Sequence, residues 1–169
     1  MTKVVFLDID GVLNGADFCA ESLKDEEGLE SWIDPLCVKR LLKILKETGA
    51  KVVFSTSWRE MIGGTFDGMD RPYVLEDLAD VVGVGHSDVL GTIPKLMSLF
   101  ERGFDPVNRG NAIRAWLEEN QDLEISHYVI LEDMPDSEMP TDKTVRTSYM
   151  ENGLQDKHVD EAIRILTSC

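Results

Sequence analysis

Asp8 and Asp10 are two carboxylates placed one residue apart, at the point where the apolar run VVFL (residues 4–7) ends. Like charges this close raise each other's pKa, and a compensating positive charge would stabilise the pair. A carboxyl group with a raised pKa can act as an acid and as a base near neutral pH. Something should therefore compensate for the pair, and we expect the rest of the chain to supply the groups that do so.

Further polar side chains follow other apolar segments of the chain. They comprise a hydroxyl cluster, a cation and three more acids. They are Ser55 and Thr56 after residues 51–54, Arg109 at the start of a predicted helix, and Glu132, Asp133 and Asp136 after residues 127–131. If the segments before them are strands of one parallel sheet, all these side chains come to the same edge of that sheet.

The first part of the chain predicts a strand, a helix and a second strand. Residues 3–7 form a short apolar, β-branched run typical of a strand buried on both faces. Asp34 and Pro35 suit the N-cap and first position of a helix, which Gly49 would end. Residues 51–54 then predict the second strand, which completes a right-handed βαβ unit.

The remaining elements are less regular. We expect a loop over residues 62–71, a short helix over 72–78, strands over 81–84, 127–131 and 144–147, and helices over 95–102, after Asn108 and at the C-terminal end. Alternating strands and helices predict an α/β fold, a doubly wound, Rossmann-like parallel sheet with helices on both faces. The carboxyl edge of that sheet is the expected ligand site.

In the order and spacing of these motifs, the chain resembles the haloacid dehalogenase (HAD) superfamily of phosphohydrolases. FLDIDGVLN (residues 6–14) is similar to its first motif, and VVFSTS (52–57) to its second. Arg109 fits the third motif, a lone Lys or Arg, and VILEDMPD (129–136) resembles the fourth. FSTSWR, RGNAIRAWL and the NGL turn near Asn152 resemble, more narrowly, the HAD domains associated with RNA-repair ("Swiss army knife") proteins.

The chain departs from the superfamily pattern in its third and fourth motifs. The fourth usually has Asp-Asp or Gly-Asp, whereas this chain has Glu132-Asp133, and only two residues separate Asp133 from Asp136. These differences leave open which of the three acids binds metal. The third motif is more often Lys, but Arg is also suitable because its guanidinium can bind phosphate with two N–H donors. Lys95 is the alternative to Arg109 for this role.

The resemblance implies a phosphoaspartyl mechanism in which Asp8 attacks phosphorus and Asp10 acts as the acid and then the base. Mg²⁺, which prefers oxygen ligands, is the implied cofactor. Its implied protein ligands are Asp8, the backbone carbonyl of Asp10, and Asp133, with Glu132 and Asp136 as further candidates.

The resemblance also implies a phosphate site. Ser55, or Thr56 if the strand ends one residue later, would hydrogen-bond the phosphoryl oxygens. Arg109 would neutralise their charge from the first turn of its helix, where free amides also favour an anion.

The length of 169 residues predicts a single domain over residues 1–169. Small lid elements fit within residues 15–33 and 60–107, but no full cap domain does. An open site of this kind can admit a small phosphomonoester or the phosphorylated end of a macromolecule. The sequence gives no indication of the oligomeric state.

The net charge of −15 disfavours a general nucleic-acid binder, although a local basic pocket or a metal could still admit a nucleic-acid end. No apolar run approaches a membrane span, so we expect no membrane partner. The N-terminal residues lack a signal-peptide pattern. The three cysteines form no CxxC pair. A cytoplasmic location is therefore expected.

Three functions compete for this set of residues. The first is a Mg²⁺-dependent phosphatase, the second a phosphatase for RNA ends, and the third a non-catalytic, receiver-like phosphoacceptor domain. A receiver places its acidic pair and its phosphoacceptor after different strands, whereas Asp8 and Asp10 follow one strand. Asp10 would also supply the acid and base that such switches lack. The pattern therefore favours an enzyme.

Overall fold

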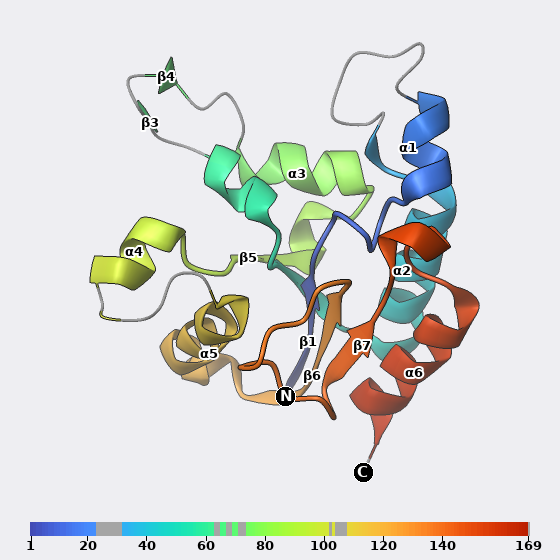
Figure 1. Cartoon of the computed structure of the whole chain (residues 1–169). Helices are drawn as coiled ribbons and strands as arrows, with labels where there is room; N and C mark the ends of the chain where they lie inside the picture. Colours follow the sequence, from blue (N-terminus) through green and yellow to red (C-terminus); the bar gives the residue numbers. More distant parts are fainter. Residues whose placement is uncertain are drawn as a thin grey trace.

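The computed structural model describes residues 1–22, 32–62, 65–66, 69–70, 74–101, 103 and 108–168. Five strands form one parallel sheet in the order β5-β2-β1-β6-β7 (Figure 1). They are β1 (Thr2–Leu7), β2 (Lys51–Phe54), β5 (Val89–Thr92), β6 (Ile125–Glu132) and β7 (Thr144–Arg146). The predicted α/β class and the parallel sheet are confirmed.

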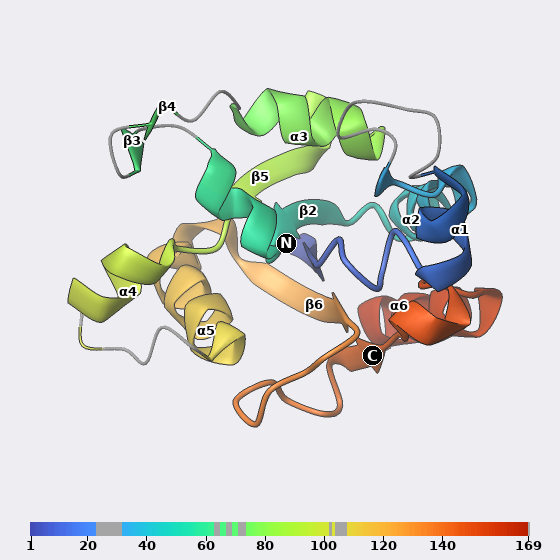
Figure 2. The same ribbon diagram turned by 45° about the horizontal axis from the view of Figure 1, so that its top comes forward.

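Helices cover both faces of this sheet (Figure 2). One face packs against α2 (Pro35–Thr48), α3 (Leu75–Val82) and α6 (Asp156–Thr167). The other packs against α4 (Leu96–Glu101) and α5 (Arg109–Glu119). The smaller elements are α1 (Ala16–Ser22), the hairpin of β3 (Thr65–Phe66) and β4 (Met69–Asp70), and the 3₁₀ turns η2 (Ser57–Met61), η3 (His86–Asp88), η4 (Gln121–Leu123) and η5 (Tyr149–Glu151).

The central strand β1 is buried on both faces because its side chains alternate between two apolar cores. Val5 and Leu7 belong to the core under α2 and α6, whereas Val4 and Phe6 belong to the core under α5. Each such side chain contributes roughly 1.5–3 kcal/mol by leaving water. The run VVFL therefore fixes both layers around the strand that ends at the acidic pair.

The predicted βαβ unit is confirmed in its details. The side chain of Asp34 accepts a hydrogen bond from Leu36 N at 2.8 Å, Pro35 is the first residue of α2, and Gly49 ends it with φ +69°. These caps satisfy backbone groups that a helix cannot pair internally. Strand β2 covers the predicted residues 51–54.

The strand predicted over residues 81–84 is wrong. Residues 81 and 82 end α3, and Gly83 ends the helix with φ +73°. Leu78 and Val82, four residues apart, bury the same helix face against the core. This helical spacing prevails over the β-propensity of the valines. The third strand of the sheet in chain order is β5, at residues 89–92.

Other boundaries shift in smaller ways. The helix expected over 72–78 is α3, which begins at Leu75, and the expected loop 62–71 includes the β3–β4 hairpin. Helix α4 ends at Glu101. Residues 23–31, 63–64, 67–68, 71–73, 102, 104–107 and 169 lie outside the described residues. The single domain and its lid elements within 15–33 and 60–107 therefore stay predictions.

The sheet order creates a switch point between β1 and β6. From β1 the chain passes through α2 and α3 on one face to reach β2 and β5, and it returns to β6 through α4 and α5 on the other face. Ligands of such sheets bind outside the carboxyl ends of the strands at this point. Within the described residues, no helix combines the length and apolar character needed to cross a bilayer.

Candidate active site

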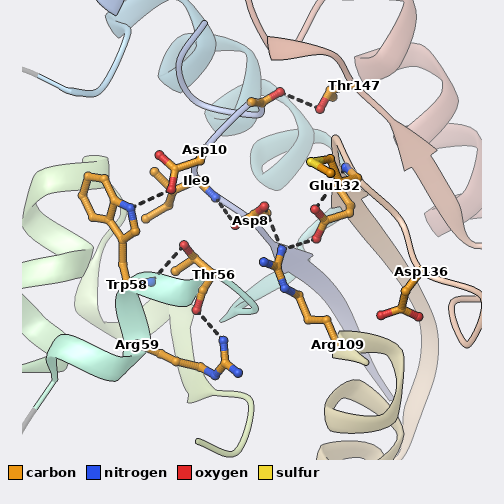
Figure 3. Close-up of polar contacts among 12 residues, drawn as sticks. Asp8, Ile9, Asp10, Thr56, Trp58, Arg59, Arg109, Glu132, Asp136 and Thr147 are labelled. Carbon is orange, nitrogen blue, oxygen red and sulfur yellow. Dashed lines mark hydrogen bonds and ion pairs between the residues drawn. The ribbon is translucent and has the colours of Figure 1, made fainter. Parts of the chain in front are cut away.

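Asp8 lies at the carboxyl end of β1, at the switch point, and its backbone N–H continues the sheet by donating to Leu131 O at 3.1 Å. The residue is only 3% exposed. Its Oδ1 accepts from Ile9 N at 2.8 Å, and its Oδ2 lies 2.8 Å from Nη1 of Arg109 (Figure 3). A buried carboxylate with one N–H donor and one guanidinium has a fixed orientation and a compensated charge.

Arg109 bridges two strand ends. Its Nη1 contacts Asp8 and also donates to the buried Glu132 at the end of β6. As expected from Asn108 in the N-cap position, Arg109 is the first residue of α5. Burial opposes its charge, but the two carboxylates outweigh this and raise the pKa of the guanidinium. The guanidinium therefore stays charged between β1 and β6.

The start of α5 is held close to the loop after β6. Gly110 N donates to Asp136 Oδ2 at 2.9 Å, and Glu138 N donates to Asp136 Oδ1 at 2.9 Å. A Cβ on Gly110 would lie 2.6 Å from the carbonyl carbon of Glu138. Asp136 thus accepts from the N-terminus of α5, whose free amides favour a carboxylate. Through this contact it positions the helix that carries Arg109.

Three carboxylates form a compact cluster at the switch point. Oxygen atoms of Asp8, Glu132 and Asp133 all lie within 4.8 Å of one another. Burial, together with the charge of Asp8, raises the pKa of Glu132 to about 8, and the same two causes raise the pKa of Asp133. A bound divalent cation would relieve this repulsion, and carboxylate oxygens are ligands that suit Mg²⁺. The residues present therefore fit the implied metal.

Gly11 allows Asp133 to approach the turn after β1. It has φ +72°, and a Cβ there would lie 2.2 Å from Asp133 Oδ2. Its carbonyl oxygen accepts from Thr147 Oγ1 at 2.7 Å. Both the backbone conformation and the close contact require a residue without a side chain. The glycine after the acidic pair thus shapes the carboxylate cluster as well as the turn.

Asp10 faces away from this cluster, toward η2 (Figure 3). The residue is exposed, but Oδ2 accepts from Trp58 Nε1 at 2.9 Å and Oδ1 accepts from Asn14 Nδ2 at 3.1 Å. Asn14 is buried, and its Oδ1 accepts from Gly11 N at 2.8 Å. The two aspartates of the pair therefore have separate sets of partners.

Ser55 and Thr56 lie at the end of β2 and are both fully buried. Ser55 N donates to Leu7 O at 2.8 Å, which aligns this strand end with that of β1. Ser55 Oγ is one of two buried side-chain polar atoms that lack a hydrogen-bond partner across the described part of the chain. Thr56 Oγ1 instead accepts from Trp58 N at 3.3 Å and caps η2. Ser55 is thus the hydroxyl with bonding capacity left for a ligand.

Two other cations near this edge, Lys95 and Arg59, have structural contacts. Lys95 Nζ donates to Ile62 O. Arg59, only 4% exposed, donates from Nη1 to Thr56 O at 2.8 Å and from Nε to Pro94 O at 3.1 Å. These contacts anchor η2 to the segment before α4. Of the two cations proposed for the third motif, it is Arg109 that the structure places against Asp8.

The structure thus brings most of the predicted site residues to one edge of the sheet. The sequence analysis missed the roles of Asn14, Trp58 and Thr147. Asn14 lies within the first motif, and an amide four residues after Asp10 can reach back across a tight turn, which is the signal that could have indicated its role. Nothing in the sequence indicates that Trp58 or Thr147 contacts the turn after β1, because both contacts depend on how distant segments pack.

An acidic cluster and a cation lie at the switch point of this doubly wound sheet, a combination of groups that suits a phosphate and a divalent cation. The chain belongs to the family described as "HAD domain in Swiss Army Knife RNA repair proteins", whose family model matches residues 4–159. The resemblance inferred from the motifs is confirmed, and membership indicates a phosphatase-type function. No curated protein and no solved structure gives a significant match to the chain.

Proposed function

We propose that the protein is a Mg²⁺-dependent phosphatase that hydrolyses a phosphomonoester through an aspartyl-phosphate on Asp8. The observation that carries this proposal is the placement of Asp8. It directly follows β1, lies beside the acids at the end of β6 and contacts Arg109. Family membership adds independent support for a phosphatase-type reaction.

Asp8, Asp133 and the backbone carbonyl of Asp10 would hold the metal. When bound, Mg²⁺ would offset the negative charge of the carboxylates and of the phosphate. Glu132 has a different role from the metal ligands, because it is buried and pairs with Arg109. It therefore orients the guanidinium toward the position that the phosphoryl group would take.

The chemistry has two steps, each with a defined path for the proton. First, a carboxylate oxygen of Asp8 attacks phosphorus, the bond to the leaving oxygen breaks, and Asp10 gives its proton to that oxygen. Second, Asp10 takes a proton from a water molecule, which attacks the phosphorus and releases Asp8 and inorganic phosphate. Asp10 thus ends each cycle protonated, as it began.

Two side chains would bind the transferring group. Ser55 Oγ is buried at the end of β2 without a partner, so a phosphoryl oxygen can supply the missing hydrogen bond. The guanidinium of Arg109 has five N–H donors, so it can hold its carboxylates and still donate to phosphate. Both groups stabilise charge that develops in the transition state.

Steady-state phosphate release from p-nitrophenyl phosphate with Mg²⁺ tests this proposal. Wild-type protein should turn over repeatedly, and EDTA or Asp8→Asn should abolish the reaction. Asp160→Asn, an exposed acid on α6, is the matched control and should keep full activity. Phosphorylation of Asp8 without repeated turnover would instead identify a receiver-like phosphoacceptor domain.

A phosphorylated RNA end is the second candidate substrate, favoured by the family description. The net charge of −15 opposes an extended track along a polyanion, so contacts confined to the terminal nucleotide fit better. Comparing kcat/KM on a 3′-phosphorylated oligonucleotide and on the matching mononucleotide tests this. A clear preference for the oligonucleotide supports an RNA-end phosphatase, and equal values support a small phosphomonoester.

A further inference from the structure

Asp10 is exposed, yet both oxygens of its carboxylate are held by N–H donors. Trp58 Nε1 lies 2.9 Å from Oδ2 (Figure 3). Asn14 Nδ2 lies 3.1 Å from Oδ1. An exposed carboxylate without such partners samples several rotamers and exchanges them quickly. Two donors on opposite oxygens select one orientation of the carboxylate plane.

The two donors differ in origin. Asn14 belongs to the same turn as Asp10 and also accepts from Gly11 N, so it holds the turn together locally. Trp58 lies 48 residues further along the chain, in the 3₁₀ turn after β2. Its indole is therefore the tertiary contact that fixes Asp10 relative to the end of β2, where Ser55 lies.

Trp58 is itself held by the segment around it. Thr56 Oγ1 accepts from the backbone N–H of Trp58 at 3.3 Å. The buried guanidinium of Arg59, the next residue, donates to Thr56 O and to Pro94 O. The turn that carries the indole is thereby held to Thr56 at its start and to the segment around Pro94. A donor on a fixed turn can preorganise a partner, whereas a donor on a mobile turn cannot.

We propose that Trp58 is a positioning residue that aims the carboxylate of Asp10 at the leaving oxygen of the substrate. This inference rests on the proposed function, because it assigns to Asp10 the proton transfer described there. Trp58 touches neither phosphorus nor the metal in this scheme. The indole N–H is a donor only, so it orients the carboxylate without itself supplying a base.

The proposal predicts a dependence on the leaving group. The p-nitrophenolate ion leaves without needing a proton, whereas the alkoxide of an alkyl phosphate such as β-glycerol phosphate needs one. The parameter kcat/KM covers the steps up to departure of the leaving group, before water attacks the phosphorylated Asp8. Misplacing Asp10 should therefore lower kcat/KM much more for the alkyl ester.

Trp58→Phe keeps an aromatic ring, although a smaller one, and removes the N–H. We expect kcat/KM to fall about 10-fold or more on β-glycerol phosphate and less than about 3-fold on p-nitrophenyl phosphate. Trp32→Phe, made at a partly exposed tryptophan outside the site described above, should change neither value. In an Asp10→Asn background, Trp58→Phe should have no further effect, because the proton donor is already absent.

Equal losses on both esters, or additive losses in the Asp10→Asn background, would overturn the positioning role while leaving the proposed phosphatase intact. Absence of turnover by the wild-type protein on both esters would overturn the proposed function and this inference with it. The two failures are therefore distinguishable.

An assay without turnover keeps the proposal testable if Trp58→Phe folds poorly. The chain has three tryptophans and hence three indole N–H signals in a ¹H–¹⁵N spectrum. Asp10→Ala should shift the signal of Trp58 and leave those of Trp32 and Trp116 in place. A Trp58 signal that does not move would show that the hydrogen bond is absent in solution, and the positioning role would fail.

Discussion

Arg109 Nη1 lies 2.8 Å from Asp8 Oδ2, although Arg109 begins α5 and Asp8 directly follows β1, on different layers of the fold. The same nitrogen donates to Glu132, so one cation serves two buried carboxylates. Removing one partner of a buried charge pair leaves the other charge uncompensated, which costs more than the pair contributes.

Arg109→Ala should therefore damage both stability and activity. We expect the free energy of unfolding without metal to fall by about 2 kcal/mol or more, and kcat/KM to fall by at least about 100-fold. Arg109→Lys keeps the charge and should recover part of both losses. Chemical denaturation and steady-state kinetics measure the two effects. The control is Arg164→Ala at an exposed position of α6. Wild-type activity in Arg109→Ala would contradict the assigned role.

Ser55→Ala should lower activity without lowering stability. The hydroxyl is buried without a partner, so removing it relieves a desolvation cost and the melting temperature should stay the same or rise. Phosphatase kcat/KM should fall by about 10- to 100-fold if the hydroxyl binds a phosphoryl oxygen. Ser57→Ala, at the exposed neighbouring serine, controls for the substitution itself. A large loss of stability in Ser55→Ala would mean that the hydroxyl has a structural partner.

Gly11→Ala should lower stability and weaken activation by Mg²⁺. A left-handed backbone costs an alanine about 1 kcal/mol, and the added Cβ would overlap the carboxylate of Asp133. Gly49 provides a matched control: it has φ +69° and nothing within 4 Å of a Cβ. Gly49→Ala should show the backbone cost alone. Titrations of activity with Mg²⁺ should then shift for Gly11→Ala only.

His158 should make stability depend on pH at the start of α6. Its Nδ1 accepts from Gln155 N at 3.0 Å, and burial, with a smaller contribution from Lys157, lowers its pKa. Since the unfolded histidine has a pKa near 6.5, this contribution is present above about pH 6.5 and is lost as the pH falls through the lower folded value. His158→Gln keeps an acceptor without a titrating group. Thermal melts from pH 7.5 to 5 should therefore decline less in this variant than in wild type.

Local patterns in the sequence predicted the elements that have clear boundary residues. Helix α2 follows from Asp34, Pro35 and Gly49, and β1 and β2 follow from short apolar runs. The valines at 81 and 82 misled the prediction because their β-propensity is overridden by the way that α3 packs on the core. Single-residue propensity cannot reveal such packing.

The candidate site was also predicted only in part: its residues could be predicted from local patterns, but some of its contacts could not. The acids, the hydroxyls and Arg109 were predicted from their positions after strands and from the family resemblance, whereas their roles stay predictions. The contacts of Trp58 with Asp10 and of Thr147 with Gly11 join segments far apart in the chain. Their partners depend on the register and packing of the whole sheet, and no local pattern encodes these.

Because Asp8 and Asp10 have separate partners, the site has two sides with different chemical properties. Asp8 lies against α5 and the end of β6, where the charged side chains of Arg109 and Glu132 are. Asp10 lies against η2 and contacts the indole of Trp58. In the proposed mechanism the phosphate lies beside Asp8 and Arg109, and the leaving oxygen lies beside Asp10, so the rest of the substrate would extend past η2. Attempts to redesign substrate preference should therefore vary exposed positions of η2, such as Ser57, and leave Trp58 and α5 unchanged.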